Sequence, residues 1–526
     1  MLYLRVRLRQ SFQSAPFLHC RLVSSSYPAT RRGPFVHENL YMAKKIAAEL
    51  MVTSEIGTLR RLLVHSPDSG LGKVVPSKAQ DWLFEDIVHL DTIRRDEYDY
   101  YTKLLLYFLD PQKIKGKLRK IDNPGNRRNF YKPGHQEFYK SDKVVELQWL
   151  LEEILHQQQT KLELIAAICA MEGVSFMEQQ KLQELHPDKL AKLFISGSYN
   201  DQQPIFAPIP NFIFTRDIGI VIKDYILLNK PAKQARTREA LLAKYIFFHH
   251  LLFNDYRNNI LELPEKHPHF LNPKDGGERK VTLEGGDVMV VSKDHVLIGI
   301  SERTSWEAAH QTINLLFEKK IMKKVTVVRI PKKRDYMHID TIFTQVKKNV
   351  WVMLGSFSKK AMKKLDEDPI EQVLEGSSKK EDKIAFIQFH VKKPKQPTYF
   401  DNLESLLEDI SQNDLGCKGK TTFIYSGNNE FPFDAREQWT DSCNLLALKD
   451  GVVLGYDRNN KTTEAFRQAG FKTIHVAELL EKLESGKITP AQIKDTLILM
   501  PSAELSRARG GFHCMSMPLL RDEPGQ

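Results

Sequence analysis

The sequence lacks the features that define several protein classes. Its five cysteines are widely separated and no two form a CxxC pair, which argues against a disulfide framework or a zinc ribbon and is typical of a reducing compartment. No uninterrupted apolar run approaches the roughly 20 residues that cross a bilayer. With 41% hydrophobic and 27% charged residues, the 526-residue chain is predicted to be a soluble protein with a sizeable core and no membrane partner.

The first 37 residues lack acidic side chains altogether. They contain no Asp or Glu but six arginines and several serines, a bias that resembles an organelle transit peptide. Met42, directly before Ala43-Lys44-Lys45, offers an alternative start. We expect residues 1–41 to be a disordered or targeting extension of a cytoplasmic protein, with a mitochondrial location as the alternative if the extension is a genuine transit peptide. Because the six arginines are part of the net charge of +11, the remaining body carries +5 and nucleic-acid binding is not expected.

The hydrophobic pattern predicts an α/β fold. Helical spacing dominates residues 77–109 and 144–194, and the second segment predicts a small helical subdomain. Beyond residue 195, short apolar runs bounded by turns alternate with helical segments. The expected strands are 54–66, 206–214, 218–228, 281–291, 295–300, 325–330, 350–354, 421–425, 445–448 and 452–455. The later expected helices are 236–252, 306–319, 403–410, 463–469 and 477–482.

Two lysine-rich stretches interrupt this pattern. Residues 113–143 are basic, contain two Pro-Gly pairs and show no apolar periodicity, so we expect a solvated insertion. Residues 359–395 contain several Lys-Lys pairs, for which an exposed charged surface is the first interpretation and a polyanion-binding patch the alternative. Aromatic residues that would stack on bases are sparse in the second stretch.

Two short segments end apolar runs with charged residues. Between Asn211 and Asp217, an apolar strand is expected to end in Arg216-Asp217, for which a local ion pair is the simplest explanation. In Glu284-Gly285-Gly286-Asp287, two acids flank two glycines. This arrangement fits a β-bulge, and it also fits a turn that presents a carboxylate to a cation.

A third segment combines a histidine with a carboxylate. His338 and Asp340 are two residues apart, so on a strand both side chains would point to the same face and could share a pocket. The similar His89-Leu90-Asp91 lies in a helical pattern, where positions i and i+2 diverge by about 200°. We therefore do not expect His89 in the site.

The fourth segment runs from Arg509 to Pro518 and contains Gly510, Gly511 and Cys514. Adjacent glycines let backbone pack close to a ligand, an arginine can meet a carboxylate, and a cysteine can act as a nucleophile. The alternative is a loop before a buried strand, with Cys514 as a small core residue. Together the four segments supply one cysteine, one histidine, several carboxylates and arginines, which are the parts needed to attack a cationic carbon such as that of a guanidinium.

Other chemistries have weaker support in the sequence. His338, Asp340, Glu284 and Asp217 could supply nitrogen and oxygen ligands to a metal, but no HExxH motif or clustered histidine pair accompanies them. No GxSxG elbow follows a strand, which argues against a serine hydrolase. We therefore expect neither a metal nor another cofactor.

The four segments in this order resemble arginine deiminases. The resemblance rests on Phe214-Thr215-Arg216-Asp217, on Glu284-Gly285-Gly286-Asp287 with the later Ser301-Glu302-Arg303-Thr304, on Met337-His338-Ile339-Asp340-Thr341, and on His513-Cys514-Met515-Ser516-Met517-Pro518. It extends over residues 52–524 and includes an opening block at 54–67. The two lysine-rich stretches and Ile218, directly after Asp217, depart from common family versions.

The resemblance implies a fold and a domain organisation. It implies a pentein-type five-bladed α/β propeller of repeated β-β-α-β units, formed by a catalytic domain at 42–526 with an inserted helical bundle at 144–199. Periodicity alone does not show this repeat. A homo-oligomer is among the assemblies that such a fold forms.

The resemblance also implies roles for individual residues. Cys514 matches the nucleophile and His338 the general acid/base, while Asp217, Asp340 and Glu284 match the carboxylates that hold the guanidinium. Arg236 and Arg303 match arginines that receive the substrate carboxylate, Asn211 and Phe214 match residues that line the pocket, and Arg509 matches a mobile arginine that closes it.

The implied reaction is hydrolysis of L-arginine by water to citrulline and ammonia through an S-linked amidino intermediate on Cys514. An amidinotransferase or another guanidine-modifying hydrolase is the enzymatic alternative. The alternative of another class is a noncatalytic scaffold of the same fold that binds RNA or protein.

Overall fold

Five mixed sheets with one common strand pattern form the framework of the described part of the chain. The computed structural model describes residues 49–524 except 80, 85, 201–202, 265–280, 334 and 361–383, and for Pro394 it describes only the backbone. The predicted extension at 1–41 and most of the second lysine-rich stretch lie outside the described residues. The residues from Ala47 onward belong to one compact unit.

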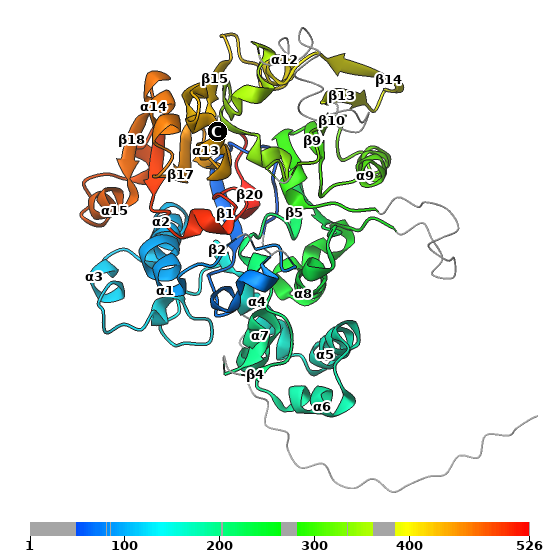
Figure 1. Cartoon of the computed structure of the whole chain (residues 1–526), viewed down its shortest axis with the longest axis vertical. Coiled ribbons are helices and arrows are strands. Elements are labelled where there is room, and N and C mark those ends of the chain that lie inside the picture. Colours follow the sequence, from blue (N-terminus) through cyan, green and yellow to red (C-terminus); the bar gives the residue numbers. More distant parts are fainter. Residues whose placement is uncertain are drawn as a thin grey trace, which may run out of the picture. The chain divides into compact units, whose positions relative to one another are not determined.

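In each of the five sheets an antiparallel pair of strands is followed, through a helical connection, by a strand parallel to the second one. The first sheet joins the two ends of the unit, because β20 (Met517–Arg521) pairs with β1 (Leu59–Val64), and α2 (Asp99–Leu109) precedes β2 (Val144–Glu146). In Figure 1 the blue β1 and the red β20 lie side by side. This pairing brings the segment around Cys514 next to the start of the unit.

The other four sheets follow in chain order. The second comprises β5 (Gly219–Ile222), β6 (Tyr225–Leu228), α8 (Thr237–His249) and β7 (Ile260–Leu261). The third comprises β8 (Val288–Ser292), β9 (His295–Ile300), α9 (Trp306–Glu318) and β10 (Lys324–Arg329), extended by β13 (Ala385–His390) and β14 (Lys393–Phe400). The fourth comprises β11 (Phe343–Lys347), β12 (Val350–Met353), α12 (Leu403–Asp409) and β15 (Thr422–Tyr425). The fifth comprises β16 (Leu446–Lys449), β17 (Val452–Tyr456), α14 (Asn460–Gln468), β18 (Lys472–His475), α15 (Val476–Glu484) and β19 (Thr496–Met500).

These pairings confirm the α/β class and agree with the β-β-α-β units that the resemblance implied. The central strands read as continuous apolar runs because both of their faces are covered: β9 pairs with β8 and β10, and all of its residues are buried. The closure of the five sheets into a propeller stays a prediction.

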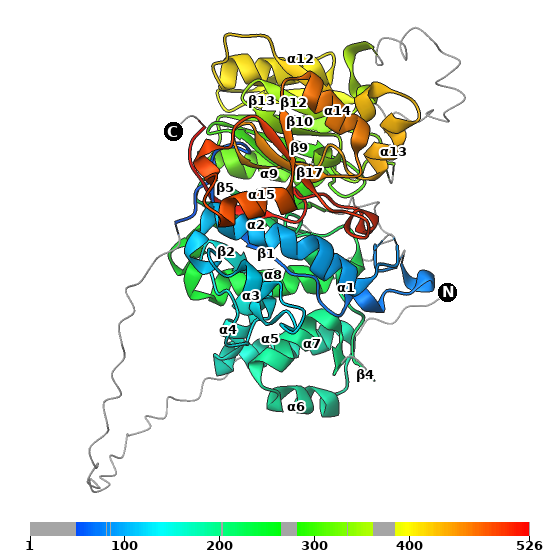
Figure 2. The ribbon, with the colours of Figure 1, turned by 90° about the vertical axis from the view of Figure 1, so that its left-hand side faces the viewer.

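The helices of residues 144–199 gather into one cluster, which both Figure 1 and Figure 2 show around α4 and α7. After β2 the chain forms α4 (Leu147–Leu155), α5 (Gln158–Glu172), α6 (Phe176–Glu184) and α7 (Pro187–Ser196). A short ribbon of β3 (Ser198–Tyr199) and β4 (Gln203–Pro204) follows. No helix among the described residues is both long enough and apolar enough to cross a membrane.

Four expectations about local structure are wrong. The helical segment expected from residue 77 begins only at Leu90, after the short 3-10 turn η2 (Pro76–Lys78). The strand expected at 206–214 is absent, and η6 (Pro210–Ile213) is a 3-10 turn, because Pro208 and Pro210 cannot donate to a strand ladder. The strand expected at 281–291 begins only at Val288, after the 3-10 turn η9 (Gly285–Asp287). The insertion at 113–143 is not simply solvated, since Ile114, Ile121, Phe130, Tyr131 and Tyr139 are buried in the core at irregular spacing.

Candidate active site

One pocket brings together nine of the ten residues predicted from the sequence. It is lined by Asn211, Phe214, Asp217, Arg236, Glu284, Arg303, His338, Arg509 and Cys514, together with Leu83 and Met337, which the sequence analysis missed. The tenth residue, Asp340, is fully buried, and its Oδ2 lies 3.6 Å from Sγ of Cys514. Residues more than 300 positions apart in the sequence therefore meet at one place.

Asp217 is positioned by its neighbours in the chain. The backbone N–H of Arg216 donates to the carbonyl of Cys514 (2.9 Å), and the Arg216 guanidinium donates to Glu55 (2.7 Å) and to the carbonyl of Val288 (2.9 Å). The hydroxyl of Thr215 donates to the carbonyl of Leu63 (3.0 Å). The local Arg216–Asp217 ion pair considered for this segment is thus wrong: Arg216 pairs with Glu55 and leaves Asp217 to the pocket.

The two glycines between Glu284 and Asp287 are required by close packing. A Cβ at Gly285 would lie 1.9 Å from the carbonyl oxygen of Arg216, and one at Gly286 would lie 2.5 Å from Nδ1 of His338. The segment is a 3-10 turn and not a β-bulge. Asp287 points away from the pocket lining and accepts from Ser301 (2.6 Å) and from the N–H of Ile339 (3.0 Å). It therefore holds the His338 segment in place.

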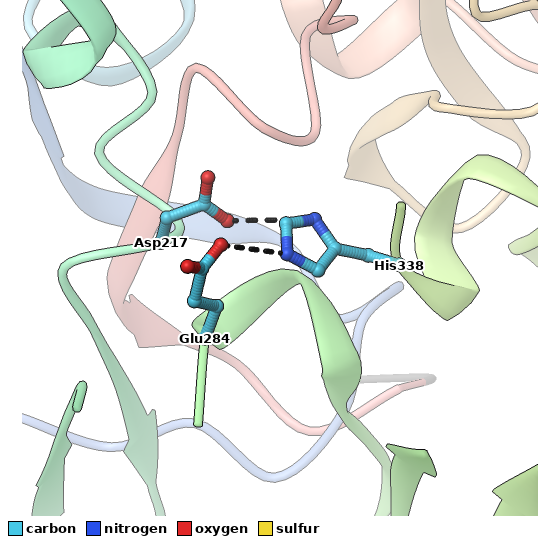
Figure 3. Close-up of side chains that lie close together, drawn as sticks. All are labelled: Asp217, Glu284 and His338. Atoms are coloured by element: carbon cyan, nitrogen blue, oxygen red, sulfur yellow. Dashed lines mark hydrogen bonds and ion pairs between the residues drawn. The ribbon is translucent and has the colours of Figure 1, made fainter. Parts of the chain in front are cut away.

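His338 faces two carboxylates, which Figure 3 shows next to each other on one side of its ring. Its Nε2 is 3.0 Å from Oε2 of Glu284, and its Nδ1 is 3.8 Å from Oδ1 of Asp217. Burial by itself opposes a charge on the ring, but the carboxylates of Asp217, Glu284 and Asp287 outweigh it and raise the pKa of His338 to about 10. The histidine is therefore protonated at neutral pH.

The strand expected around His338 is wrong, although His338 lines the pocket and Asp340 contacts Cys514. His338 precedes the 3-10 turn η10 (Ile339–Thr341), so the two side chains do not share the face of a strand. Asp340 instead contacts Cys514 and His513. His89, which we did not expect in the site, lies at the start of α1 (Leu90–Thr92) and contacts Thr92.

The same two carboxylates also hold Arg236. Its Nη1 donates to Asp217 (2.7 Å) and to Glu284 (3.2 Å), and its Nε donates to Glu239 (2.8 Å). The guanidinium of Arg236 thus occupies the position that the resemblance assigns to the substrate guanidinium. Its own predicted role as receptor of the substrate carboxylate stays a prediction.

Ligand atoms of Asp217, Glu284 and His338 are close enough together to hold a metal ion, since all lie within 4.8 Å of one another. The donor set does not fit one well. The Arg236 guanidinium already contacts both carboxylates, and protonated His338 has no lone pair to offer. The ion pairs with Arg236 show that these two carboxylates accept a guanidinium, and their role toward a substrate stays a prediction.

Cys514 lies in a polar but water-poor setting. Its backbone N–H donates to Oδ1 of Asn444 (2.9 Å), and the side chain is 5% exposed. Burial, with the charges of Asp340 and Asp217, raises the pKa of the Cys514 thiol well above its usual value. In the substrate-free molecule the sulfur is therefore a thiol, and an added cation is needed to favour the thiolate.

A second histidine, His513, contacts Asp340. Nδ1 of His513 is 2.8 Å from Asp340, and its Nε2 is 3.2 Å from Glu55. Although burial raises the pKa of Asp340, the contact with His513 outweighs it, and the pKa of Asp340 is lowered. The sequence analysis gave no role to His513, Glu55 or Asn444. The only feature of the sequence that pointed to His513 was its position next to Cys514, and no feature of the sequence pointed to Asn444.

Several buried polar atoms of the pocket residues have no hydrogen-bond partner among the described residues. These are Nε of Arg303, Nε and Nη1 of Arg509, Nη2 of Arg236 and Oδ1 of Asp340. Each such atom costs about 1–3 kcal/mol if it stays unsatisfied. Their concentration around one pocket indicates a ligand that carries both hydrogen-bond donors and acceptors.

Two further predicted residues frame the opening. Cζ of Arg509 lies 3.8 Å from the centre of the Trp439 ring, and the Arg509 backbone is left-handed with φ of 59°. Nδ2 of Asn211 donates to the carbonyl of Trp82 (2.7 Å). Gly510 allows this segment to pack on Phe214, because a Cβ there would lie 2.3 Å from the Phe214 ring.

Comparison with known proteins finds chains that are similar to this one over most of its length. Residues 142–521 match the family model described as arginine deiminase. The arginine deiminases of Staphylococcus aureus strains Newman and COL are 30% identical over 483 residues, which covers 90% of this chain and 98% of theirs. Among solved structures, the amidinotransferase SxtG of Microseira wollei matches with a TM-score of 0.43 and 12% identity over 91% of this chain and 98% of its own. A dimethylarginine dimethylaminohydrolase adduct matches with a TM-score of 0.33 and 17% identity over 59% and 76%.

Proposed function

Since the chain belongs to the arginine deiminase family, we propose that it hydrolyses L-arginine to L-citrulline and ammonia, with Cys514 as the nucleophile. The observation that carries this proposal is the convergence of Cys514, His338 and two carboxylates on one pocket whose arginines keep unpartnered donors. The substrate has a cation at one end and a carboxylate at the other, and the pocket offers complementary groups for both.

Recognition begins with an exchange of guanidinium groups. Arg236 neutralises Asp217 and Glu284 in the substrate-free pocket, so the substrate guanidinium has to displace its Nη1. Two paired, charge-assisted hydrogen bonds then fix the planar cation with its central carbon toward Sγ of Cys514. The displaced Arg236 and the unpartnered Nε of Arg303 receive the α-carboxylate. This geometry selects free arginine, because a peptidyl arginine would leave both cations without a partner.

The chemical steps follow from the protonation states. The bound cation favours loss of the Cys514 thiol proton to solvent, and the resulting thiolate attacks the guanidinium carbon and forms an S–C bond in a tetrahedral adduct. Protonated His338 gives its proton to one terminal nitrogen, the C–N bond breaks, and ammonia leaves. An amidino intermediate that carries the whole arginine skeleton remains on sulfur.

Water completes the reaction. Neutral His338 takes a proton from a water molecule whose oxygen attacks the same carbon, and the S–C bond breaks as the thiolate leaves. The carbon then carries the ureido oxygen of citrulline. The atoms balance as one arginine and one water giving one citrulline and one ammonia, without another reactant.

Product analysis tests this proposal. The protein is incubated with L-arginine, with and without glycine, and citrulline, ammonia and ornithine are quantified. We expect citrulline and ammonia in equal amounts, unaffected by glycine. Ornithine with guanidinoacetate would instead identify an amidinotransferase.

The covalent intermediate gives a second discrimination. After an acid quench, mass spectrometry of the Cys514 peptide should detect an adduct with the mass of arginine less ammonia. A bare amidino group would identify the transferase, and no adduct together with no turnover would support a noncatalytic scaffold.

A further inference from the structure

A second pocket, away from Cys514, is lined by an unusual number of basic side chains. It contains about 1240 Å³ of space, part of it open to solvent, between the loop after β1, the helical segment of α1 (Leu90–Thr92) and η3 (Ile93–Tyr98), and the 113–143 insertion. Six basic residues line it: Arg94, Arg95, Arg127, Arg128, Lys132 and Lys192. Burial and the charges of the nearby arginines lower the pKa of Lys132. The cations are therefore close enough together to repel one another.

The carboxylates that line this pocket compensate only part of that charge. Asp68 and Glu146 are 3.1 Å and 2.9 Å from the two ring nitrogens of buried His65. A ring with a carboxylate at each nitrogen needs a proton on both, and the pKa of His65 is raised to about 9 because these carboxylates outweigh its burial. Asp188 contacts His186, and Asp91 is exposed. The lining therefore contains six basic residues against four carboxylates, two of which contact His65.

Two hydroxyl groups of this pocket lack partners among the described residues. Tyr131 is 5% exposed, and neither its OH nor the Oγ of Ser69 has a hydrogen-bond partner. Both residues line the pocket beside Arg128. Arg128 itself is held by Asp99 through Nε at 2.9 Å and through Nη2 at 2.5 Å. The pocket thus combines fixed neutral donors with an excess of cations.

We propose that this pocket binds a small phosphate-bearing anion. Phosphate oxygens accept hydrogen bonds from hydroxyl and guanidinium groups alike, and a multivalent anion relieves repulsion among several cations at once. The basic insertion at 113–143 has no role in the reaction at Cys514, and in this proposal it contributes to anion binding. The proposal stands independently of the activity at Cys514.

Isothermal titration calorimetry with inorganic pyrophosphate and with ATP, on the full chain at two salt concentrations, tests this site. We expect saturable binding that weakens with salt. The double variant Arg127→Glu/Lys132→Glu should weaken it by at least about 10-fold, since it removes two charge-assisted contacts. The matched control, Lys418→Glu/Lys420→Glu, changes the net charge equally at exposed lysines outside the pocket and should leave the affinity within about twofold.

Tyr131→Phe separates a built site from general surface charge. It removes one unpartnered hydroxyl without changing charge and should weaken binding about 2- to 10-fold, as expected for one hydrogen bond. Arginine turnover should be unchanged in all these variants. Absence of pyrophosphate and ATP binding would overturn the proposal, as would equal losses in the pocket and control variants or an unchanged affinity in Tyr131→Phe. Binding of a poly(U) oligonucleotide but of neither small anion would replace it with an RNA surface.

Discussion

Two buried histidines of this protein have similar surroundings and different predicted tasks. His338 faces Asp217 and Glu284, and His65 lies between Asp68 and Glu146. In both cases the carboxylates outweigh burial, and the pKa is raised to about 10 for His338 and to about 9 for His65. A perturbed histidine beside acids therefore does not by itself identify a catalytic centre.

The difference lies in what adjoins each network. Cys514 and the unpartnered Arg303 and Arg509 line the pocket of His338. The ring of His65 packs against Phe212 at 5.1 Å, and no cysteine is among the described residues that line the neighbouring pocket. A cysteine thiol in the same pocket as the protonated histidine distinguishes the first region.

The largest effect that separates the regions should come from removal of these groups. Cys514→Ala should lower citrulline formation by at least about 10⁴-fold, as loss of a nucleophile does in other enzymes. His338→Ala should lower kcat by at least about 100-fold because general acid/base catalysis is lost. His65→Asn, measured in the same citrulline assay, should keep kcat within about threefold of the unsubstituted protein. A folded His65→Asn protein, checked by circular dichroism, that has lost turnover would break the comparison.

Each region also contains a buried arginine that neutralises carboxylates. Arg236 pairs with Asp217, Glu284 and Glu239, and Arg128 pairs with Asp99. Either Arg→Ala substitution should lower the free energy of unfolding by about 3–5 kcal/mol, because it leaves buried charge unpaired. Denaturant unfolding of both variants measures this loss.

Added L-arginine should distinguish the two losses. In a Cys514→Ala background, which prevents turnover, arginine should recover stability in Arg236→Ala because its guanidinium can take the vacated position. Added L-arginine should raise the stability of Arg128→Ala no more than it raises the stability of the Cys514→Ala protein. Equal recovery in both variants would contradict the exchange of guanidinium groups at Asp217 and Glu284.

Arg303 offers a contrast within the first region. Its Nε makes no hydrogen bond with the described residues, and the carboxylate of Glu302, 4.0 Å from this Nε, is only at the limit of an ion pair. Arg303→Ala should therefore raise KM for L-arginine about 10- to 100-fold, the loss of a charge-assisted hydrogen bond. The free energy of unfolding should stay within about 0.5 kcal/mol. Steady-state kinetics and urea unfolding check the two parts, and a loss of stability without a change in KM would assign Arg303 to the scaffold.

Much of this site could be predicted because its residues belong to short segments whose chemistry is local. Asp217, Glu284, His338 and Cys514 each occur beside a turn or strand end with an unusual composition. The partner of Arg216 could not be predicted, since Glu55 comes from 161 residues away. Asn444 carries no local signal either, and only the packing of distant segments places it at Cys514.

The fold was predicted unevenly for the same reason. Apolar runs such as 295–300 and 350–354 are strands because both faces are covered. A strand after the Cys514 loop was expected only as an alternative, and β20 is that strand. β11, β13, β14, β18 and β19 were not predicted, and β14 contains two lysines and two prolines, so it does not read as a strand until its partner is known. The aromatic residues of the 113–143 insertion were misread because short 3-10 turns have no regular period of burial.

Alkaline pH should weaken both histidine networks over different ranges. Each folded-state pKa lies above the ordinary value of 6.5, so each histidine stabilises the fold fully below pH 6.5 and loses this contribution as pH rises through the raised pKa. The shifts correspond to about 3 kcal/mol for the His65 network and about 5 kcal/mol for the His338 network. The difference in unfolding free energy between the unsubstituted protein and His65→Asn should disappear by about pH 9, and that for His338→Asn by about pH 10. Flat difference profiles would show that the rings are neutral in the fold.

The smallest expected difference concerns an arginine stacked on an aromatic ring in each region. Arg128 lies 5.2 Å from the Tyr131 ring and is fixed by Asp99, whereas Arg509 lies 3.8 Å from the Trp439 ring and keeps Nε and Nη1 unpartnered. Of these two arginines, only Arg509 is expected to move its guanidinium away from the aromatic ring, here that of Trp439. Because Trp439 is 46% exposed, the stacking is worth about 0.5–1 kcal/mol, and Trp439→Leu should change kcat/KM about two- to fivefold. Trp439→Phe keeps a ring and should change kcat/KM less, while Tyr131→Phe should not change kcat/KM.

In the Cys514→Ala background, L-arginine should alter tryptophan fluorescence, and Trp439→Phe should remove most of that signal. If the signal persists in Trp439→Phe, Arg509 does not leave the ring when substrate binds, and the closing role predicted for it is wrong.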